Sequence, residues 1–520
     1  MSILSIKFFV FLIAAVIVFY IAPKKYQWVV LLTASLIFYL FSGPAYIVYL
    51  LFSAVVSFFT GKKLDKLNNR MKYCIENEPD RKIQRQIKEK YSKRKKKIIS
   101  TGIIFVLLEL VAVKYLSFLL GNIGMIFGTD IFDGINIIAP LGCSFYTFAI
   151  IGYMADIYSI KAKAQNDFLK YLLFVSYFPQ IIQGPIPRFN RLSPQFFTPK
   201  KYNVFSFKNG ALRILWGVFK KLTVAEVISP VVAKVYGDSS AYNGTIILMV
   251  TLLYSVQMYA DFSGYVDIVA GASELFGIKL DENFNQPYFA KTIPEFWRRW
   301  HISLSSWFRE YVFYAISSSK LMLRLNKKTR KKFGNETGRI ISVVIPVLSV
   351  WMLTGLWHGA AWNYVLWGLF HGILIMFSII FSPYFKKFEQ KLNLIFDNSF
   401  CDFLRILRTF LLCTLGRVFF RANGVHDAFL MFRKIFTDIQ SPNEFIVKTI
   451  GEKKIILLCF SIIIILICSI IREKNKDFRK WYWDRKIVFR WSIVLFLIFF
   501  TLMFGSYGPG AESSFIYEQF

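Results

Sequence analysis

Apolar stretches recur along the whole chain and are separated by short polar or basic segments. A helix needs about 20 mostly apolar residues to cross the hydrocarbon core of a bilayer. The pattern therefore predicts an all-α polytopic membrane protein with about 11 or 12 transmembrane helices plus re-entrant ones. The predicted spans are Phe8–Ala22, Trp28–Phe41, Tyr46–Thr60, Ile103–Leu120, Ile137–Tyr158, Phe168–Ile182, Ile214–Val235, Ile246–Phe262, Ile340–Leu356, Trp362–Phe381, Phe403–Phe420, Ile455–Ile471 and Val488–Phe504, of which at least one is partial.

Composition supports this prediction and argues against two other classes. Of the 520 residues, 55% are hydrophobic and 18% charged, and 56 are Phe, which disfavours a soluble domain. The net charge of +32 comes from Lys and Arg blocks between the apolar stretches. Such blocks are typical of cytoplasmic loops beside a lipid bilayer, so we do not predict nucleic-acid binding.

The charge pattern also predicts the topology. Residues 61–98 form a strongly basic segment, which we place in the cytoplasm as a solvated loop, helical or disordered. The N-terminus and the tail, residues 505–520, then lie outside the cell. No soluble domain interrupts the spans, so residues 1–520 are expected to form a single membrane domain.

Two segments cannot be continuous lipid-facing helices. Phe178–Arg188 contains three prolines and a glycine, and Asp281–Pro294 contains Pro287 and Pro294. The backbone groups that such residues free are tolerated only against protein or water. Interrupted helices near intramembrane polar groups often mark a binding site.

Two further stretches place ionisable side chains among aromatic ones, and we interpret them as walls of a reaction chamber. A charge at the centre of a bilayer costs about 2.5–3.5 kcal/mol on insertion scales, so such groups face protein or a wet cavity. Trp351–His371 contains His358 in an apolar run. Lys291–Tyr314 contains Glu295, Arg298, Arg299, His301, Arg309 and Glu310.

The chain has four histidines, and two are candidates for chemistry. His358 could act as a general base near neutral pH, with small neighbours leaving room for a substrate. The alternative is a core histidine bound to a backbone carbonyl. His301 could belong to the chamber or to an interfacial amphipathic helix. We read His371 as structural and His426 as solvated.

The remaining motifs point to no standard site. Asp261 and Ser263 lie in the segment YADFSGYVD, Tyr259–Asp267, with no GxSxG elbow and no basic partner at a set spacing. Six cysteines without a CxxC pair predict neither a zinc site nor a disulfide framework. Up to this point a transporter fits as well as an enzyme.

A resemblance to a known protein family favours the enzyme over the transporter. FWRRWHISLS, Phe296–Ser305, with Trp307 and Tyr311, resembles the signature of the membrane-bound O-acyltransferase (MBOAT) superfamily, in its bacterial alginate O-acetyltransferase branch. The similarity runs from about residue 138 to the end, with a motif-bearing core at 138–422. Glu310 stands where relatives have Asp, and Ser317–Ser319 replaces a Gly-Gly pair. The other similar segments are PLGCSFYTF (Pro140–Phe148), FPQIIQGPIPR (Phe178–Arg188), DFSGYVD (Asp261–Asp267), ENFNQPY (Glu282–Tyr288), GLWHG (Gly355–Gly359) and GRVFFRA (Gly416–Ala422).

The resemblance implies an MBOAT fold around a central funnel and a role for each histidine. His358 matches the catalytic general base and His301 the second, more variable histidine. Arg299, Trp300, Ser305, Asp261 and Ser263 are the candidates for the chamber lining. The acyl donor would be cytoplasmic acetyl-CoA or a carrier-protein thioester, as a substrate rather than a bound cofactor, and no metal is expected. Basic residues in Leu321–Arg339 could attract the donor's phosphates or only mark the cytoplasmic side.

The C-terminal residues, FIYEQF, resemble the terminal hexapeptide of bacterial polysaccharide acyltransferases. Tyr517 could accept the acyl group and pass it to an extracellular SGNH or esterase-like partner, which would acylate a surface polysaccharide. The alternative is a tail that only packs on the outer surface. Two other functions stay open: D-alanyl transfer to teichoic acid, and a non-enzymatic polysaccharide export scaffold.

Overall fold

The computed structural model describes residues 3–41, 43–128, 140–391, 398–441, 444–474 and 478–507. These residues form helices joined by turns and one isolated β-bridge. They divide into two compact units, Met1–Ala211 with Val269–Asp281, and Leu212–Ile268 with Glu282–Phe520. The boundaries fall within the helices α9 (Val204–Lys220) and α11 (Gly244–Leu275).

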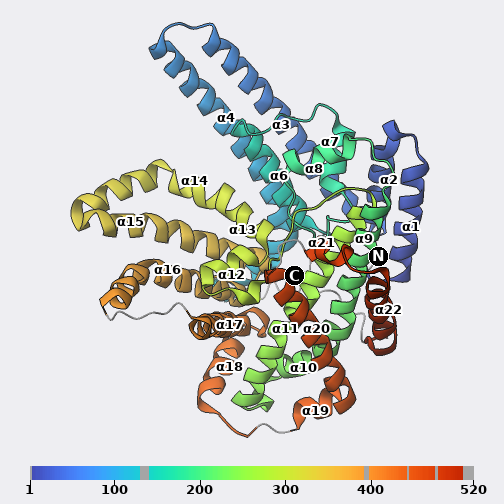
Figure 1. Cartoon of the computed structure of the whole chain (residues 1–520). Coiled ribbons are helices and arrows are strands. Elements are labelled where there is room, and N and C mark those ends of the chain that lie inside the picture. The colour runs from blue at the N-terminus through green and yellow to red at the C-terminus, as the bar shows by residue number, and fades with distance from the viewer. Residues whose placement is uncertain are drawn as a thin grey trace. The chain divides into compact units, whose positions relative to one another are not determined.

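Both units are built from helices of very different length (Figure 1). The first unit contains α1 (Ile6–Ile21), α2 (Gln27–Leu40), α3 (Ile47–Glu76), α4 (Arg81–Leu110), α5 (Leu116–Phe127), α6 (Cys143–Tyr158), α7 (Phe168–Ser176) and α8 (Phe189–Phe197). The second contains α10 (Glu226–Gly237), α12 (Ile293–Arg299), α13 (Ile302–Phe308), α14 (Tyr314–Ser317), α15 (Lys320–His358), α16 (Trp362–Lys391), α17 (Ser399–Arg421), α18 (Val425–Thr437), α19 (Phe445–Ile450), α20 (Glu452–Lys474), α21 (Phe478–Trp483) and α22 (Ile487–Phe504).

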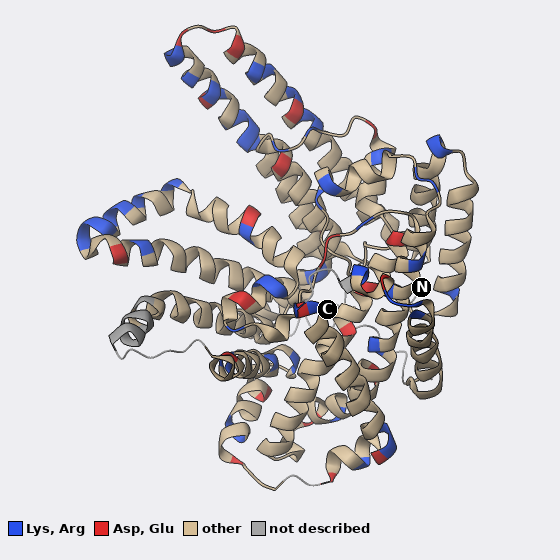
Figure 2. Ribbon diagram, in the orientation of Figure 1, with Lys and Arg blue, Asp and Glu red and all other residues tan. Residues whose placement is uncertain are grey.

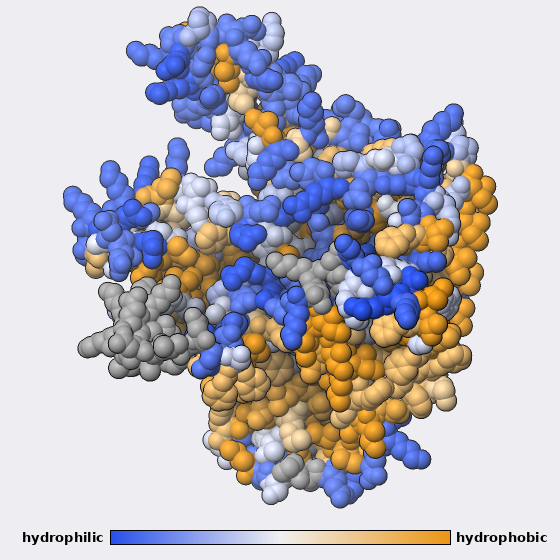
Figure 3. Space-filling view, viewed as in Figure 1, coloured by the Kyte–Doolittle hydropathy of each residue, from blue (hydrophilic) through white to orange (hydrophobic). Residues whose placement is uncertain are grey.

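The basic segment 61–98 is a helical hairpin made by the ends of α3 and α4. Asp80 starts α4, because its carboxylate accepts a hydrogen bond from the backbone N–H of Lys82 at 2.7 Å. Figure 2 shows Lys and Arg gathered toward the turn, and Figure 3 shows a hydrophilic surface there. Deeper in the pair, the buried Glu109 carboxylate accepts hydrogen bonds from Ser53 and Tyr146. The cytoplasmic position of the hairpin stays a prediction.

Seven helices are long and apolar enough to cross a membrane among the residues described, which is consistent with a multi-pass membrane protein. They are Pro44–Glu76, Arg81–Phe127, Gly244–Leu275, Lys320–His358, Trp362–Ser382, Glu452–Lys474 and Ile487–Phe504. On α20, the apolar side chains of Ile456, Phe460 and Ile463 are exposed, and Figure 3 shows broad hydrophobic areas on the surface of the molecule. Such a surface suits contact with lipid.

Other predicted spans lie on shorter helices, such as α1 with 16 residues and α2 with 14, or differ from the prediction in their course. The predicted span Phe168–Ile182 ends as a helix at Ser176, because Pro179 follows. The predicted span Ile214–Val235 carries the buried ionisable side chains of Lys220, Lys221 and Glu226 around the π-helix η4 (Lys221–Ala225), which make it less apolar than a lipid-facing helix. Phe178–Arg188 and Asp281–Pro294 are irregular, as predicted, and contain turns and the short helix η6 (Pro287–Phe289).

Close packing of α15 against α16 sets the position of His358 in the second unit. Glycines on both helices allow this approach. A side-chain carbon at Gly368 would overlap the backbone carbonyl oxygen of Trp351, and one at Gly355 would overlap that of Tyr364. His358 is the last residue of α15, so this contact anchors the end of the helix that carries it.

We expect Gly368→Ala to destabilise the protein, because the obstructing atoms belong to the backbone and cannot rotate away. Overpacking of this kind costs about 1–3 kcal/mol. The measurement is thermal unfolding of the detergent-solubilised protein. Gly237→Ala, where nothing lies within 4 Å of the added carbon, is the matched control. Equal unfolding temperatures for the two variants would contradict the tight helix contact.

Candidate active site

The signature segment is held by backbone pairing with the residues that precede it. The Asn285 N–H donates to the Arg299 carbonyl at 2.9 Å, and the Ile302 N–H donates to the Asn283 carbonyl at 3.0 Å. Between these bonds, Trp300 forms the β-bridge with Phe284. At the start of α12, Thr292 accepts from the Glu295 N–H, and Glu295 accepts from the Lys291 N–H. These hydrogen bonds form a local cap for the short helix.

His301 follows this pairing in a left-handed backbone conformation, with φ of 46°. Such strain in a non-glycine residue persists only where its surroundings enforce it, and it is concentrated at functional sites. The imidazole is 1% exposed and lies edge-on to the rings of Phe262 and Trp357, with centroid distances of 4.8 and 5.9 Å. Burial lowers the pKa of His301 to about 3, so its ring is neutral at physiological pH.

His358 is 3% exposed and lies where α15 ends. Its ring packs edge-on against Trp357 and Trp367, both at 4.8 Å, and against Phe420 at 5.2 Å. The space beside Gly359, which the sequence suggests could admit a substrate, is filled by the ring of Tyr364. The surroundings of His358 on this side are therefore aromatic and packed.

Trp357 connects the two histidines, because its indole contacts both imidazole rings. The fold thus brings together Lys291–Tyr314 and Trp351–His371, the two stretches that the sequence singles out. Trp300 is buried beside this group, and Ser305 is half-buried one turn into α13, where its N–H donates to the His301 carbonyl at 3.1 Å. Tyr517 lies outside the described residues.

Asp261 and Ser263 belong to a buried polar cluster on α11. Both bind lysines near the junction of α9 and η4: Lys221 lies 2.6 Å from the Asp261 carboxylate, and Lys220 donates to the Ser263 hydroxyl at 2.8 Å. Lys221 also pairs with Glu226 at 2.5 Å, and all three of these ionic side chains are at most 2% exposed. Phe262, between the two candidates, is the residue that reaches His301. Asp261 and Ser263 therefore support the helix that carries Phe262.

Comparison with known proteins places this arrangement in a family. Residues 162–330 match the MBOAT, membrane-bound O-acyltransferase family. The chain is 30% identical to the teichoic acid D-alanyltransferase of Bacillus subtilis over 303 residues, covering 56% of this chain and 71% of that protein. The chain belongs to the membrane-bound O-acyltransferase family. It is therefore an O-acyltransferase.

Two further relatives of this O-acyltransferase carry names that specify an acceptor. The probable alginate O-acetylase AlgI of Azotobacter vinelandii is 28% identical over 436 residues, covering 83% of this chain and 77% of that protein. The peptidoglycan O-acetyltransferase of Helicobacter pylori is 32% identical over 342 residues, covering 61% and 60%.

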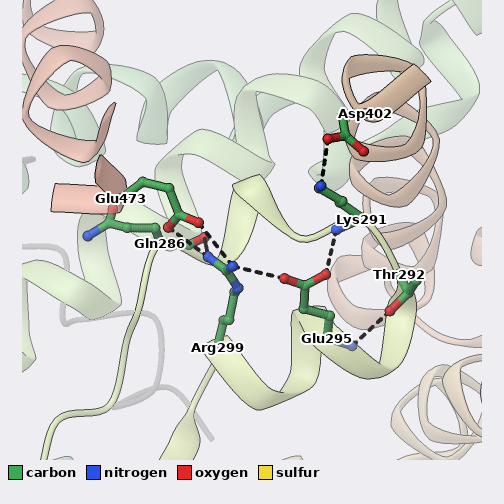
Figure 4. Close-up of polar contacts among 7 residues, drawn as sticks. All are labelled: Gln286, Lys291, Thr292, Glu295, Arg299, Asp402 and Glu473. Atoms are coloured by element: carbon green, nitrogen blue, oxygen red, sulfur yellow. Dashed lines mark hydrogen bonds and ion pairs between the residues drawn. The ribbon is translucent and has the colours of Figure 1, made fainter. Parts of the chain in front are cut away.

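Arg299, which the sequence predicts to line a chamber, is engaged in ion pairs (Figure 4). Its guanidinium lies 2.8 Å from Glu295, the i,i+4 pair that the sequence predicts, and binds both carboxylate oxygens of Glu473 at 2.8 and 3.0 Å. Lys291 extends the cluster to Asp402 at 2.6 Å. The cluster therefore ties the signature helix to α17 and α20.

His371 occupies the aromatic wall behind the histidine pair. It is 2% exposed and contacts the rings of Trp297, Trp351 and Trp367 at 4.9, 5.6 and 5.2 Å. This packing agrees with a structural role. His426 is exposed on α18.

Sequence reasoning missed three buried cations of this unit: Lys220, Lys221 and Arg417. The signal was present, because two consecutive lysines inside a predicted span are costly in lipid. Asp261 and Asp267 lie 40 and 47 residues further along the chain on another helix, so local spacing could not reveal them as partners, whereas Glu226, the other partner of Lys221, is five residues away.

Replacing Lys221 with Met should destabilise the acyltransferase strongly, because two carboxylates would stay buried without their cation. Removing one partner from a buried ion pair costs about 3–5 kcal/mol. Thermal unfolding in detergent gives the measurement, and adding Asp261→Asn should restore part of the loss. Lys448→Met, which breaks an exposed pair with Glu444 at 3.0 Å, is the control and should change little. Similar losses in both variants would refute this interpretation.

Proposed function

We propose that this enzyme transfers an acyl group, most simply acetyl, from a cytoplasmic thioester such as acetyl-CoA toward hydroxyl groups of a surface polysaccharide. The observation that carries the proposal is the packing of His301 and His358 on the indole of Trp357, in two stretches whose sequences resemble those of O-acetyltransferases. Relatives named for alginate and for peptidoglycan acetylation support the choice of polysaccharide as the acceptor.

His358 acts in this proposal as the general base. It takes the hydroxyl proton as the oxygen attacks the thioester carbonyl, and returns it to the departing thiolate. Holding donor and hydroxyl in one site supplies much of the rate. The neutral ring of His301 orients the acceptor or assists in moving the proton. The aromatic walls keep water away from the thioester, so hydrolysis does not compete.

The topology of the proposal puts the donor inside the cell and the acceptor outside. The protein spans the plasma or inner membrane. Its N-terminus and the tail, residues 505–520, lie outside the cell. Tyr517 accepts the acyl group as an aryl ester, an activated form because phenoxide leaves more readily than an alkoxide. An extracellular SGNH or esterase-like partner then acylates the polysaccharide.

A second candidate function is D-alanyl transfer to teichoic acid from a carrier protein. The similarity to the Bacillus subtilis D-alanyltransferase, which extends over 71% of that protein, favours it. Mass spectrometry of the ester released from surface polymers distinguishes the two, because D-alanine contains nitrogen and acetate does not.

His358→Gln should abolish ester formation while polymer still reaches the surface. Loss of a general base lowers rates by about 10²–10⁴-fold. The readouts are ester content of the surface polysaccharide by mass spectrometry, polymer yield, and the amount of protein in the membrane. His426→Gln, at an exposed histidine, is the control and should behave as wild type. Unchanged ester content in His358→Gln would exclude His358 as the base.

Tyr517→Phe should remove polysaccharide acylation, because it deletes the accepting oxygen and keeps the ring. The matched control is Tyr507→Phe, at a tyrosine whose hydroxyl donates to the Thr501 carbonyl at 2.6 Å. Ester content is measured as above, and normal acylation of Tyr517→Phe would reject the carrier role. Intact-protein mass spectrometry of wild type should show an acyl adduct that the variant lacks.

A further inference from the structure

Arg417 is a buried cation on the helix that also carries Phe420, a neighbour of His358. It lies on α17 with 4% of its surface exposed. Its guanidinium donates to the Ser255 hydroxyl and to the Tyr288 hydroxyl, both at 3.0 Å. It also lies over the rings of Tyr288 and Trp300, at 5.6 and 5.5 Å from their centroids. Its protein partners are therefore hydroxyls and aromatic faces, none of which carries a negative charge.

The other strongly buried cations of this unit are neutralised by carboxylates. Arg213 and Lys220 lie 2.8 and 2.7 Å from Asp267, and Lys221 lies between Asp261 and Glu226. In the part of the chain that the structure describes, Arg417 forms no ion pair with a carboxylate. A guanidinium cannot lose its proton in a protein, and a buried charge without a counter-charge is costly. Its retention calls for an anion from elsewhere.

Arg417 lies close to residues of the candidate active site, where a reacting group could supply the missing negative charge. Trp300, whose ring lies beneath the guanidinium, directly precedes His301. Phe420, three residues after Arg417 on α17, packs on the His358 ring at 5.2 Å. The guanidinium thus packs on the residue that precedes His301, and its helix carries the ring that packs on His358.

We propose that Arg417 stabilises the negative charge that develops on the acyl group during transfer. This inference rests on the proposed function. The acceptor oxygen bonds to the thioester carbon, its proton moves to His358, and the carbonyl electron pair shifts to the carbonyl oxygen. When this oxyanion collapses, the carbon–sulfur bond breaks and the thiolate takes the proton from His358. A fixed cation is worth most at such a buried, developing charge.

The test uses the full chain reconstituted in vesicles with acetyl-CoA, with thiol release as the readout and a soluble peptide of the C-terminal residues FIYEQF as the acceptor. Arg417→Met, which keeps the length and removes the charge, should lower kcat by about 10²–10³-fold with KM for acetyl-CoA nearly unchanged. Arg405→Met is the control on the same helix. Arg405 is partly exposed and pairs with Asp402 at 3.3 Å, so its loss should leave kcat as in wild type.

The charge series separates catalysis from folding. Arg417→Lys keeps a cation, whereas Arg417→Gln keeps hydrogen-bond donors without charge. We expect kcat to fall in the order Arg, Lys, Gln, with thermal unfolding recorded for each variant. If Gln equals or exceeds Lys, charge is not what the site requires and the proposal is overturned. This comparison also decides the matter if Arg417→Met does not fold.

Two further outcomes would overturn the proposal. A raised KM with unchanged kcat in Arg417→Met would mean that Arg417 binds the donor's phosphates before reaction. Wild-type kcat and KM in that variant would mean that the cation has no part in transfer. The proposed function fails separately: in that case wild type and His358→Gln release thiol equally slowly, whatever residue stands at 417.

Discussion

A charge buried in a membrane protein has to find its partner within the protein, because hydrocarbon supplies none. This constraint organises the second unit. The two lysines where α9 meets η4 bind α11 through Asp261, Ser263 and Asp267, and this attachment fixes the rotation of α11 about its axis. Phe262 then points toward His301. The carboxylates of Asp261 and Asp267 therefore fix the helix that carries Phe262, and Phe262 packs against the neutral imidazole of His301.

Aromatic residues, in addition to the ion pairs, hold the histidines in position. Trp300, Trp357 and Trp367 surround the histidines with flat, rigid surfaces that exclude water and offer few competing hydrogen bonds. A backbone held in a left-handed conformation at His301 adds stiffness of another kind. The histidines and the aromatic side chains around them are set in position when the protein folds, so they need not rearrange during the reaction. This suits acyl transfer.

Much of this could be predicted from the sequence. The apolar pattern gave an all-helical membrane protein, the prolines gave the irregular segments, and the i,i+4 spacing gave the Arg299–Glu295 pair. The limits have physical causes as well. Hydropathy misplaces the ends of helices because an apolar stretch can be broken by a proline, as after Ser176, and it does not reveal that lysines inside such a stretch are paired. The second partner of Arg299, Glu473, lies 174 residues away and leaves no local signal. The space beside Gly359 looked open in sequence because the ring that fills it comes from a neighbouring helix.

The α3–α4 hairpin has a practical consequence for imaging. Membrane proteins with little mass outside the bilayer give particle images that are difficult to align. Residues 77–80 join two helices of 30 residues each and are largely exposed. A small rigid domain inserted at this turn, with continuous helical junctions on both sides, would provide a fiducial for electron cryomicroscopy without altering the helices that carry the histidines.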